Sequence, residues 1–347
     1  IDIPSNSELQ TIEEYAFKNL LIKSIFIPPH VTKICKGAFS YCKQLRQVDI
    51  PSNSELQIIE ENAFEYSSIV SIFIPARVIN LKEGWCSKMK KKLTNIEVDP
   101  RNSRYSYLDD KMIICKTSET SENYNKIVFV RKDIIEITIP SFIKTIGSYA
   151  FEYCNQLQRI DIPSNSELQT IRKGAFMSSS IKSIFIPPRV RNISIYAFFY
   201  CKQLQQVDIP SNSELQVIEE HLFESSSIKS IIIPPSITKI CQYAFSNCKQ
   251  LRQVDIPSNS ELQTIEVNAF NQSPIKSIFI PPHVKNICRG AFSSCMIQRI
   301  DIPQNSELRI IEANVFSQSL IESIFIPASV INLKKGWCND IGKLTNI

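Results

Sequence analysis

The amino-acid sequence predicts a solenoid of about 14 short rungs that stack side by side, with a parallel β-sheet on one face. Two observations carry this prediction. The phrase Val48-Asp49-Ile50-Pro51-Ser52-Asn53-Ser54-Glu55-Leu56-Gln57 returns in close copies that begin at Ile1, Ile160, Val207, Val254 and Ile300. A second phrase, Ser24-Ile25-Phe26-Ile27-Pro28, returns between them at Ser71, Ser183, Ser230, Ser277 and Ser323. Because tandem units pack only on their neighbours, we expect one continuous body over residues 1–347 instead of two or three globular domains.

Each rung is expected to contain a short strand that ends at a proline. The closing prolines are 22 to 25 residues apart, except for the step from Pro100 to Pro140. The frame Leu-x-x-Val-x-Ile precedes them, as in residues 45–50. β-Branched residues at alternate positions are typical of a strand with one buried face. Proline cannot donate to a sheet ladder, so it marks the end of the strand.

A small residue followed by an aromatic residue comes later in each rung. The pair is Ala-Phe at 16–17, 38–39, 63–64, 150–151, 175–176, 197–198, 244–245, 269–270 and 291–292. We interpret this segment as one turn of helix whose ring packs inward against the strand. The spacing from proline to aromatic alternates, so the true unit is a pair of rungs of about 47 residues. A single rung cannot bury its own apolar face, and stacking makes the core.

Residues 101–135 interrupt the repeat and are expected to form a β-hairpin insert. Two strand-like runs, residues 111–116 and 126–131, flank a polar loop from Thr117 to Asn125. This pattern predicts a hairpin that projects from the solenoid. The chain opens in the middle of a repeat, and its last residues copy those near residue 90, so we expect it to be part of a longer protein.

The eleven cysteines are expected to be small buried thiols. Equivalent cysteines recur every second rung, about 9.6 Å apart, which exceeds the reach of a disulfide. Pairs within one rung, such as Cys35 with Cys42, remain conceivable. There is no C-x-x-C motif, and the three histidines lie far apart. No metal and no cofactor is expected. The chain has seven glycines and no phosphate-binding or nucleophile motif, so we expect no enzymatic activity.

An asparagine recurs after the proline of alternate rungs, at the position of a ladder that ties adjacent turns together. We expect its amide to hold the turn carbonyls of neighbouring rungs, since buried backbone groups must find partners. The members are Asn6, Asn53, Asn165, Asn212, Asn259 and Asn305.

The candidate binding site is the outward face of the sheet. In the frame Leu-x-x-Val-x-Ile, the last x points away from the core and alternates between phenylalanine and aspartate along the chain. The predicted ligand-binding residues are Phe26, Asp49, Phe73, Asp161, Phe185, Asp208, Asp255, Phe279, Asp301 and Phe325. Bases such as Lys23, Arg46 and Lys182 border them. Exposed aromatic residues on a regular surface favour recognition of a protein ligand. The alternative is that phenylalanine merely suits a strand surface and was copied by duplication.

Charge and hydropathy exclude two other classes of partner. The formal net charge is +5, and the basic residues alternate with acidic ones without forming a block. This is too weak for a nucleic-acid footprint, so no nucleic acid is expected. No apolar run approaches the roughly 20 residues of a membrane helix, so no membrane span is expected.

Residues 27–45 resemble the BspA-like leucine-rich repeats of surface proteins from mucosal bacteria and parasitic protists. That pattern is roughly Ile-Pro-x-x-Val-x-x-Ile-x-x-x-Ala-Phe-x-x-Cys-x-x-Leu, and it is matched from Ile27 through Cys42 to Leu45. The resemblance implies a curved leucine-rich-repeat solenoid with a parallel sheet on the concave face, and short helical turns and loops on the convex face.

For function, the same resemblance implies a cell-surface or secreted adhesin or antigen that binds host or matrix proteins through the concave face. The resemblance supplies no catalytic residues. Because no natural caps are evident, end-to-end self-association is also expected to be possible. Two alternatives stay open: an intracellular leucine-rich-repeat scaffold and a self-associating surface-coat element.

Overall fold

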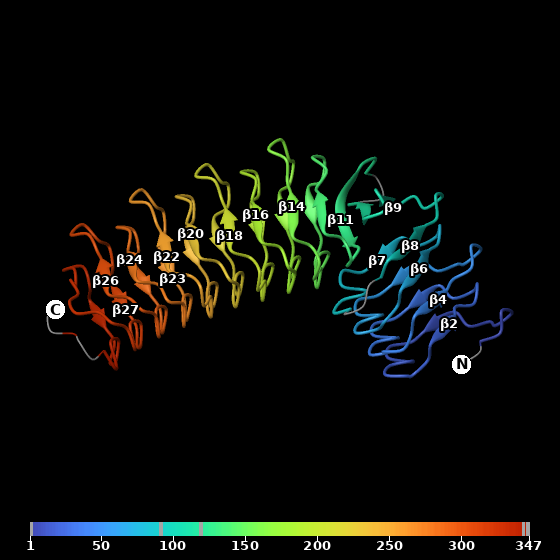
Figure 1. Cartoon of the computed structure of the whole chain (residues 1–347), viewed down its shortest axis with the longest axis horizontal. Coiled ribbons are helices and arrows are strands. Elements are labelled where there is room, and N and C mark those ends of the chain that lie inside the picture. The colour runs from blue at the N-terminus through green and yellow to red at the C-terminus, as the bar shows by residue number, and fades with distance from the viewer. Residues whose placement is uncertain (1–2, 90–92, 118–120, 342–343, 345–347) are drawn as a thin grey trace. The chain divides into compact units, whose positions relative to one another are not determined.

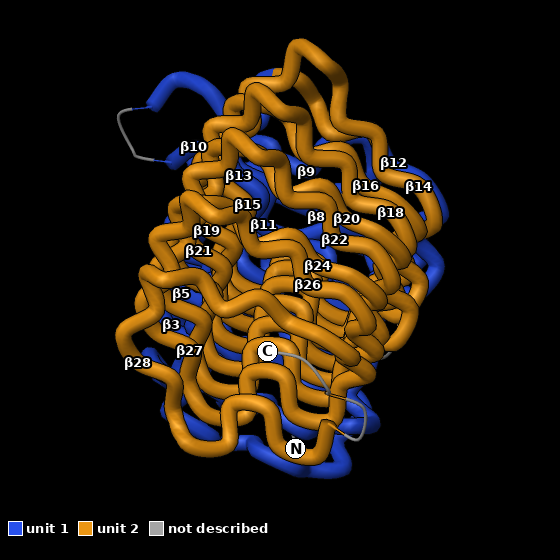
Figure 2. The backbone as a smooth tube through the Cα atoms, turned by 90° about the vertical axis from the view of Figure 1, so that its left-hand side faces the viewer, with its two compact units in different colours: residues 1–137, 142–157 blue, residues 138–141, 158–347 orange. Residues whose placement is uncertain are grey.

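The computed structural model describes residues 3–89, 93–117, 121–341 and 344, and the chain divides into two compact units. Unit 1 comprises residues 1–137 and 142–157, and unit 2 comprises residues 138–141 and 158–347 (Figure 2). Both are parallel β-solenoids, with about 14 turns in all and no helix among the described residues. The predicted fold class is therefore confirmed. A single continuous body over 1–347 stays a prediction.

The predicted strands before the prolines form the first strand family (Figure 1). In unit 1 they are β2 (Ser24–Phe26), β4 (Gln47–Asp49), β6 (Ser71–Ile74) and β8 (Asn95–Val98), which pair in parallel in that order. In unit 2 they are β14 (Arg159–Asp161), β16 (Ser183–Phe185), β18 (Gln206–Asp208), β20 (Ser230–Ile232), β22 (Gln253–Asp255), β24 (Ser277–Phe279) and β26 (Arg299–Asp301). β12 (Glu136–Thr138) spans the boundary between the units. The central residue of each strand, such as Ile25 or Val48, is buried in the core.

A second strand family follows the turn after each proline, and the sequence analysis did not predict it. In unit 1 it comprises β1 (Thr11–Ile12), β3 (Lys33–Ile34), β5 (Ile58–Ile59), β7 (Asn80–Leu81) and β13 (Thr145–Ile146). In unit 2 it comprises β15 (Thr170–Ile171), β17 (Asn192–Ile193), β19 (Val217–Ile218), β21 (Lys239–Ile240), β23 (Thr264–Ile265), β25 (Asn286–Ile287), β27 (Ile310–Ile311) and β28 (Asn332–Leu333). Figure 2 shows the two families on opposite sides of each turn of unit 2. Strands are recognised in a sequence by the alternation of apolar and polar residues, and two residues are too few to show it.

The expected one-turn helices at the Ala-Phe pairs are wrong, because turns take their place. Gly37 and Tyr41, on either side of Ala38-Phe39, have φ angles of 61° and 62°. Left-handed residues interrupt a right-handed helix. The backbone N–H groups therefore alternate in their partners: Ser40 N donates to Gly37 O at 2.9 Å, whereas Phe39 N donates to Ala63 O of the next rung at 2.8 Å. The same alternation recurs along both units.

The aromatic rings of the Ala-Phe pairs are driven inward, as expected, and form the centre of each core. In unit 1 the Phe39 ring lies between those of Phe17 and Phe64, with centroid distances of 5.1 and 5.3 Å. In unit 2 the row contains Phe176, Phe198, Phe223, Phe245, Phe270, Phe292 and Phe316. Neighbouring centroids in that row are 5.0 to 5.8 Å apart. Parallel stacking at these distances adds to the burial of the rings.

The insert of unit 1 contains three antiparallel strands, β9 (Tyr105–Leu108), β10 (Met112–Lys116) and β11 (Tyr124–Val130). β11 also pairs in parallel with β13. Ile113 and Phe129 are buried. The two predicted runs thus pair as an antiparallel hairpin, β10 with β11, and β11 joins it to the solenoid strand β13. Residues 118–120 of the expected loop lie outside the described residues.

The expected asparagine ladder is wrong. Asn53 and its five equivalents are exposed at the turn tips, whereas the next residue, such as Ser54, is buried. Ser54 Oγ accepts a hydrogen bond from Leu56 N at 3.2 Å, so the serine holds the turn together. Asn102, which the sequence analysis did not single out, does bridge two rungs. It is 5% exposed, and its Nδ2 donates to Pro75 O at 2.8 Å and to Val78 O at 3.0 Å.

Candidate functional site

The predicted site residues of unit 1 lie on the outward face of the first strand family. Phe26 on β2 is the register partner of Asp49 on β4, and Phe73 on β6 is the partner of Glu97 on β8. Both phenylalanines are half-buried and both acids are exposed. Their neighbours along each strand, such as Ile25 and Val48, point into the core, so the alternation fixes the direction of the site residues. Glu97 completes this row and was not among the predicted site residues.

The other predicted residues form an equivalent row in unit 2, which we name the outward face of unit 2. Phe185 pairs with Asp208, and Phe279 pairs with Asp301. Asp161 and Asp255 are exposed on β14 and β22, and Phe325 is exposed beyond β26. The ten predicted residues are therefore divided between two faces, three on unit 1 and seven on unit 2.

The two-rung repeat of the sequence is visible in the pairing of these strands. Each phenylalanine strand of unit 2 matches the next aspartate strand over three residue pairs, as in β16 with β18. From an aspartate rung to the next phenylalanine rung, the backbone is joined outside the strands, for example by Lys276 N donating to Arg252 O at 3.4 Å. As a result, an aromatic side chain and an acid from the following rung form one repeating patch.

Neighbouring polar side chains orient the acids of both faces. Gln47 Nε2 donates to Asp49 Oδ1 at 2.7 Å, and Gln253 Nε2 donates to Asp255 Oδ2 at 2.7 Å. Arg299 Nη2 lies 3.6 Å from Asp301 Oδ2, with both side chains exposed. Each partner is two residues before its acid on the same strand, where side chains share a face. The carboxylates stay solvent-exposed and can still accept hydrogen bonds from a ligand.

The outward face of unit 2 is hollowed around Asp255. A hollow of about 260 Å³ is lined by Ile232, Val254, Asp255, Ile256, Pro257, Ser277 and Phe279. Ile232 occupies a phenylalanine position and is 63% exposed. The sequence signal for this hollow is Ile232, which stands at a phenylalanine position and was not among the predicted site residues.

The cysteines have a structural role. Ten of the eleven, all except Cys115, carry free thiols, and eight of these ten are buried. The thiol of Cys248 donates to Phe223 O of the preceding rung at 3.1 Å, and the thiols of Cys201 and Cys295 make the same bond to Phe176 O and Phe270 O. Burial raises the pKa of Cys201, Cys248 and Cys295 to about 12, so these thiols stay protonated and unreactive near neutral pH. Among the described residues, no group of side chains could hold a metal ion.

Unit 1 also buries three charged residues that the sequence analysis missed, Asp99, Lys132 and Glu152. Lys132 Nζ donates to Ala150 O at 3.2 Å and lies 4.7 Å from the centroid of the Phe129 ring. Glu152 accepts from Lys88 N at 2.7 Å, and burial raises the pKa of its carboxyl group. These contacts close the end of the insert against the turns of unit 1. The sequence signal was Lys132, two residues after the apolar run of β11.

A comparison with protein-family models matches nearly the whole chain. The model for the BspA type leucine rich repeat region, which holds six copies of the repeat, fits residues 1–107, 122–252 and 242–347. The chain belongs to the BspA-type leucine-rich repeat family. None of the curated proteins compared with the chain matches it.

Solved structures of leucine-rich repeat proteins share the fold. A leucine-rich repeat protein from Eubacterium ventriosum ATCC 27560 has a TM-score of 0.70 at 24% identity, covering 84% of this chain and 81% of that one. The pneumococcal vaccine antigen PcpA has a TM-score of 0.63 at 20% identity, covering 86% and 72%. A leucine-rich repeat protein from Bacteroides ovatus ATCC 8483 has a TM-score of 0.53 at 20% identity, covering 94% and 78%. At sequence identities of 20 to 24%, these similarities show a shared fold and nothing more.

Membership of the BspA-type family makes the chain a repeat scaffold of a kind that is generally non-catalytic and typically mediates contacts between proteins. Within residues 3–89, 93–117, 121–341 and 344, no helix has the length and apolar character needed to cross a membrane.

Proposed function

We propose that the chain is the recognition part of a cell-surface or secreted adhesin or antigen, and that it binds a protein ligand through the outward faces of units 1 and 2. The observation that supports this most is the regular alternation of half-buried phenylalanines with exposed acids on both faces. Aromatic side chains are favoured anchors in interfaces, and rows of acids beside bases orient a partner. PcpA, which shares the fold, is a vaccine antigen, and this fits a surface location.

The anchoring phenylalanines of each face can be tested separately. In unit 1, Phe26→Ser with Phe73→Ser is expected to weaken ligand binding at least about 10-fold, because truncating an interface anchor costs on the order of 1 to 2 kcal/mol. In unit 2, Phe185→Ser with Phe279→Ser is expected to have a similar effect. Binding is measured against immobilised extracellular-matrix proteins and cultured epithelial cells.

The matched control is Tyr200→Ser, since Tyr200 is 48% exposed at a turn instead of on the outward face. This variant is expected to bind normally. Unchanged affinity in both double variants would refute the outward-face proposal. Failure of the unaltered protein to bind any matrix protein or cell surface would count against an adhesin.

One observation favours an intracellular scaffold as the second candidate. Ten of the eleven cysteines, all except Cys115, carry free thiols, and free thiols are the rule in reducing compartments. A secretory signal in the full reading frame would exclude this candidate, whereas its absence there would favour it over the adhesin.

A further inference from the structure

The hollow around Asp255 lies where one rung of unit 2 differs from the repeat. Ile232 on β20 stands at the position that carries Phe185 on β16 and Phe279 on β24. Both phenylalanines are half-buried, whereas Ile232 is 63% exposed. Because isoleucine is smaller than phenylalanine, it leaves part of that position open, and the hollow of about 260 Å³ begins there. A single difference between rungs therefore gives this place on the face a shape of its own.

Two apolar side chains form walls of the hollow, and an acid lies between them. Ile232 is the register partner of Asp255 on β22, and Phe279 lies on the following strand of the face. The two walls are thus two rungs apart, which corresponds to about 9.6 Å. Asp255 is exposed between them. The volume is below the usual range for sites of whole small molecules, so it suits one side chain of a larger ligand.

The carboxylate of Asp255 is oriented by the protein but keeps its charge. Gln253 Nε2 donates to Asp255 Oδ2 at 2.7 Å, and this partner is neutral. Asp301 on the same face differs, because Arg299 replaces the glutamine and its Nη2 lies 3.6 Å from Asp301 Oδ2. Among the described residues, Asp255 forms no ion pair. A cation from outside the chain can therefore pair with this acid.

The rest of the lining suits the other parts of an arginine side chain. The Asp255 carboxylate has acceptor positions beyond the one that Gln253 uses, and the Ser277 hydroxyl can accept as well. The Phe279 ring offers a face on which a guanidinium can stack. Ile232 offers apolar surface to the methylene stem, since long cationic side chains pack their stems on such surface.

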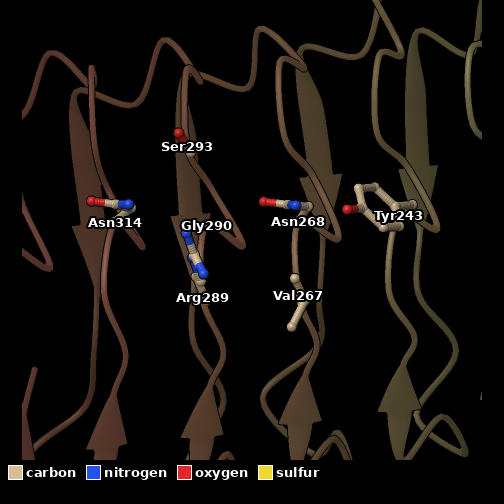
Figure 3. A pocket seen from close by; sticks show the side chains of 7 residues that line it. All are labelled: Tyr243, Val267, Asn268, Arg289, Gly290, Ser293 and Asn314. Atoms are coloured by element: carbon tan, nitrogen blue, oxygen red, sulfur yellow. The ribbon is translucent and has the colours of Figure 1, made fainter.

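Another hollow of unit 2 lacks this combination of groups. It has a volume of about 350 Å³ and lies beside Gly290, where Figure 3 shows the side chains of Asn268 and Asn314 directed toward that rung from either side. None of its seven lining residues is acidic, and Arg289 is one of them. A cation would find no carboxylate there and would meet a like charge. Of these two hollows, the one at Asp255 therefore selects a cation.

We propose that the hollow at Asp255 binds one arginine side chain of the protein ligand. The guanidinium pairs with the Asp255 carboxylate and stacks on the Phe279 ring, while the methylene stem packs on Ile232. The aromatic wall favours the planar guanidinium of arginine over the more strongly hydrated ammonium of lysine. This inference rests on the proposed function, because it names the side chain by which a protein ligand engages the outward face of unit 2.

Methyl NMR of the isoleucine-labelled protein tests the proposal, with a capped tripeptide that carries arginine between two alanines. The signals of Ile232 and Ile256, which both line the hollow, are expected to shift with a Kd on the order of 1 mM. Conservative replacement of each isoleucine by valine assigns its signal. The same tripeptide with citrulline, which is neutral and similar in shape, is expected to bind at least about 10-fold more weakly. The lysine tripeptide is expected to bind more weakly than the arginine one.

Two variants test the charge and the shape of the hollow separately. Asp255→Asn keeps the size of the side chain but removes its charge, so binding is expected to weaken at least about 10-fold. Ile232→Phe restores the phenylalanine of the repeat and is expected to fill the hollow, which abolishes the shift of the Ile256 signal. The matched control is Asp161→Asn, the same substitution on the same face but outside the lining, and it is expected to bind normally.

Equal binding of the arginine and citrulline tripeptides would overturn the proposal, as would unchanged binding in either Asp255→Asn or Ile232→Phe. Tighter binding of the lysine tripeptide would overturn the assignment to arginine. The adhesin proposal fails in a different way. A protein that binds matrix proteins through its phenylalanines but takes up no arginine tripeptide at about 20 mM would refute this inference alone. A protein that binds the tripeptide but no matrix protein or cell surface would count against the adhesin alone.

Discussion

Phe245→Ala is expected to destabilise unit 2 by about 3 to 5 kcal/mol. The Phe245 ring is fully buried and lies between the rings of Phe223 and Phe270, at centroid distances of 5.3 and 5.0 Å. Its removal leaves a cavity and breaks the stack on both sides, and each rung depends on its neighbours for burial. The measurement is chemical denaturation followed by tryptophan fluorescence in a Trp85→Phe background. Trp337 is then the one tryptophan of the chain, and it lies in unit 2.

The matched control for this prediction is Phe279→Ala. Phe279 has the same side chain in the same unit but lies half-buried on the outward face, so its loss is expected to cost about 1 kcal/mol or less. If both variants lost equal stability, the inner and outward assignments of the two phenylalanine rows would be wrong.

Asn102→Ala is expected to destabilise unit 1 by about 3 kcal/mol. The Asn102 amide donates to Pro75 O and Val78 O, and its Oδ1 accepts from Arg104 N at 2.9 Å and Tyr105 N at 2.8 Å. Removal of the side chain strips four backbone groups of this partner, and an unpaired buried polar group costs about 1 to 3 kcal/mol. The measurement is the unfolding of unit 1 followed by Trp85 fluorescence in a Trp337→Phe background.

Asn53→Ala serves as the control, because Asn53 is exposed at its turn and a surface substitution of this kind changes stability by about 0.5 kcal/mol or less. Asn102→Asp keeps the acceptor but places a buried carboxylate against the carbonyl oxygens of Pro75 and Val78, so a loss at least as large as that of Asn102→Ala is expected. If Asn53→Ala lost as much stability as Asn102→Ala, that result would support the predicted asparagine ladder and contradict the structure.

The sequence predicted those features that depend on local alternation. Val48 and Ile50 point inward and Asp49 outward because adjacent residues of a strand face opposite sides, and this pattern is written in the residues themselves. The inward stack of rings followed from the constant position of the Ala-Phe pair. The candidate site residues were therefore placed on the correct face of each strand, but their division between two units could not be read from a continuous repeat.

The turns were mispredicted because their geometry depends on contacts with the next rung. Tyr196 and His221 adopt positive φ angles, which few such residues do, and backbone bonds to neighbouring rungs hold them there. Part of the signal was present in the sequence. Gly37, Asn268 and Gly290 each directly precede an Ala-Phe pair, and glycine and asparagine are the residues that favour positive φ angles.

The central claim is that the rungs of unit 2 stack in one register, so that equivalent residues form a straight row on the outward face. Spin labels on cysteines introduced at Asp161, Asp208 and Asp301 measure this spacing directly by pulsed electron resonance. Cys288→Ser and Cys338→Ser remove the two half-exposed native thiols, and the remaining nine are buried. Asp208 and Asp301 are four rungs apart and are expected at about 19 Å, whereas Asp161 and Asp301 are six rungs apart and are expected at about 29 Å. Distances that do not grow in proportion to the number of rungs would contradict the account.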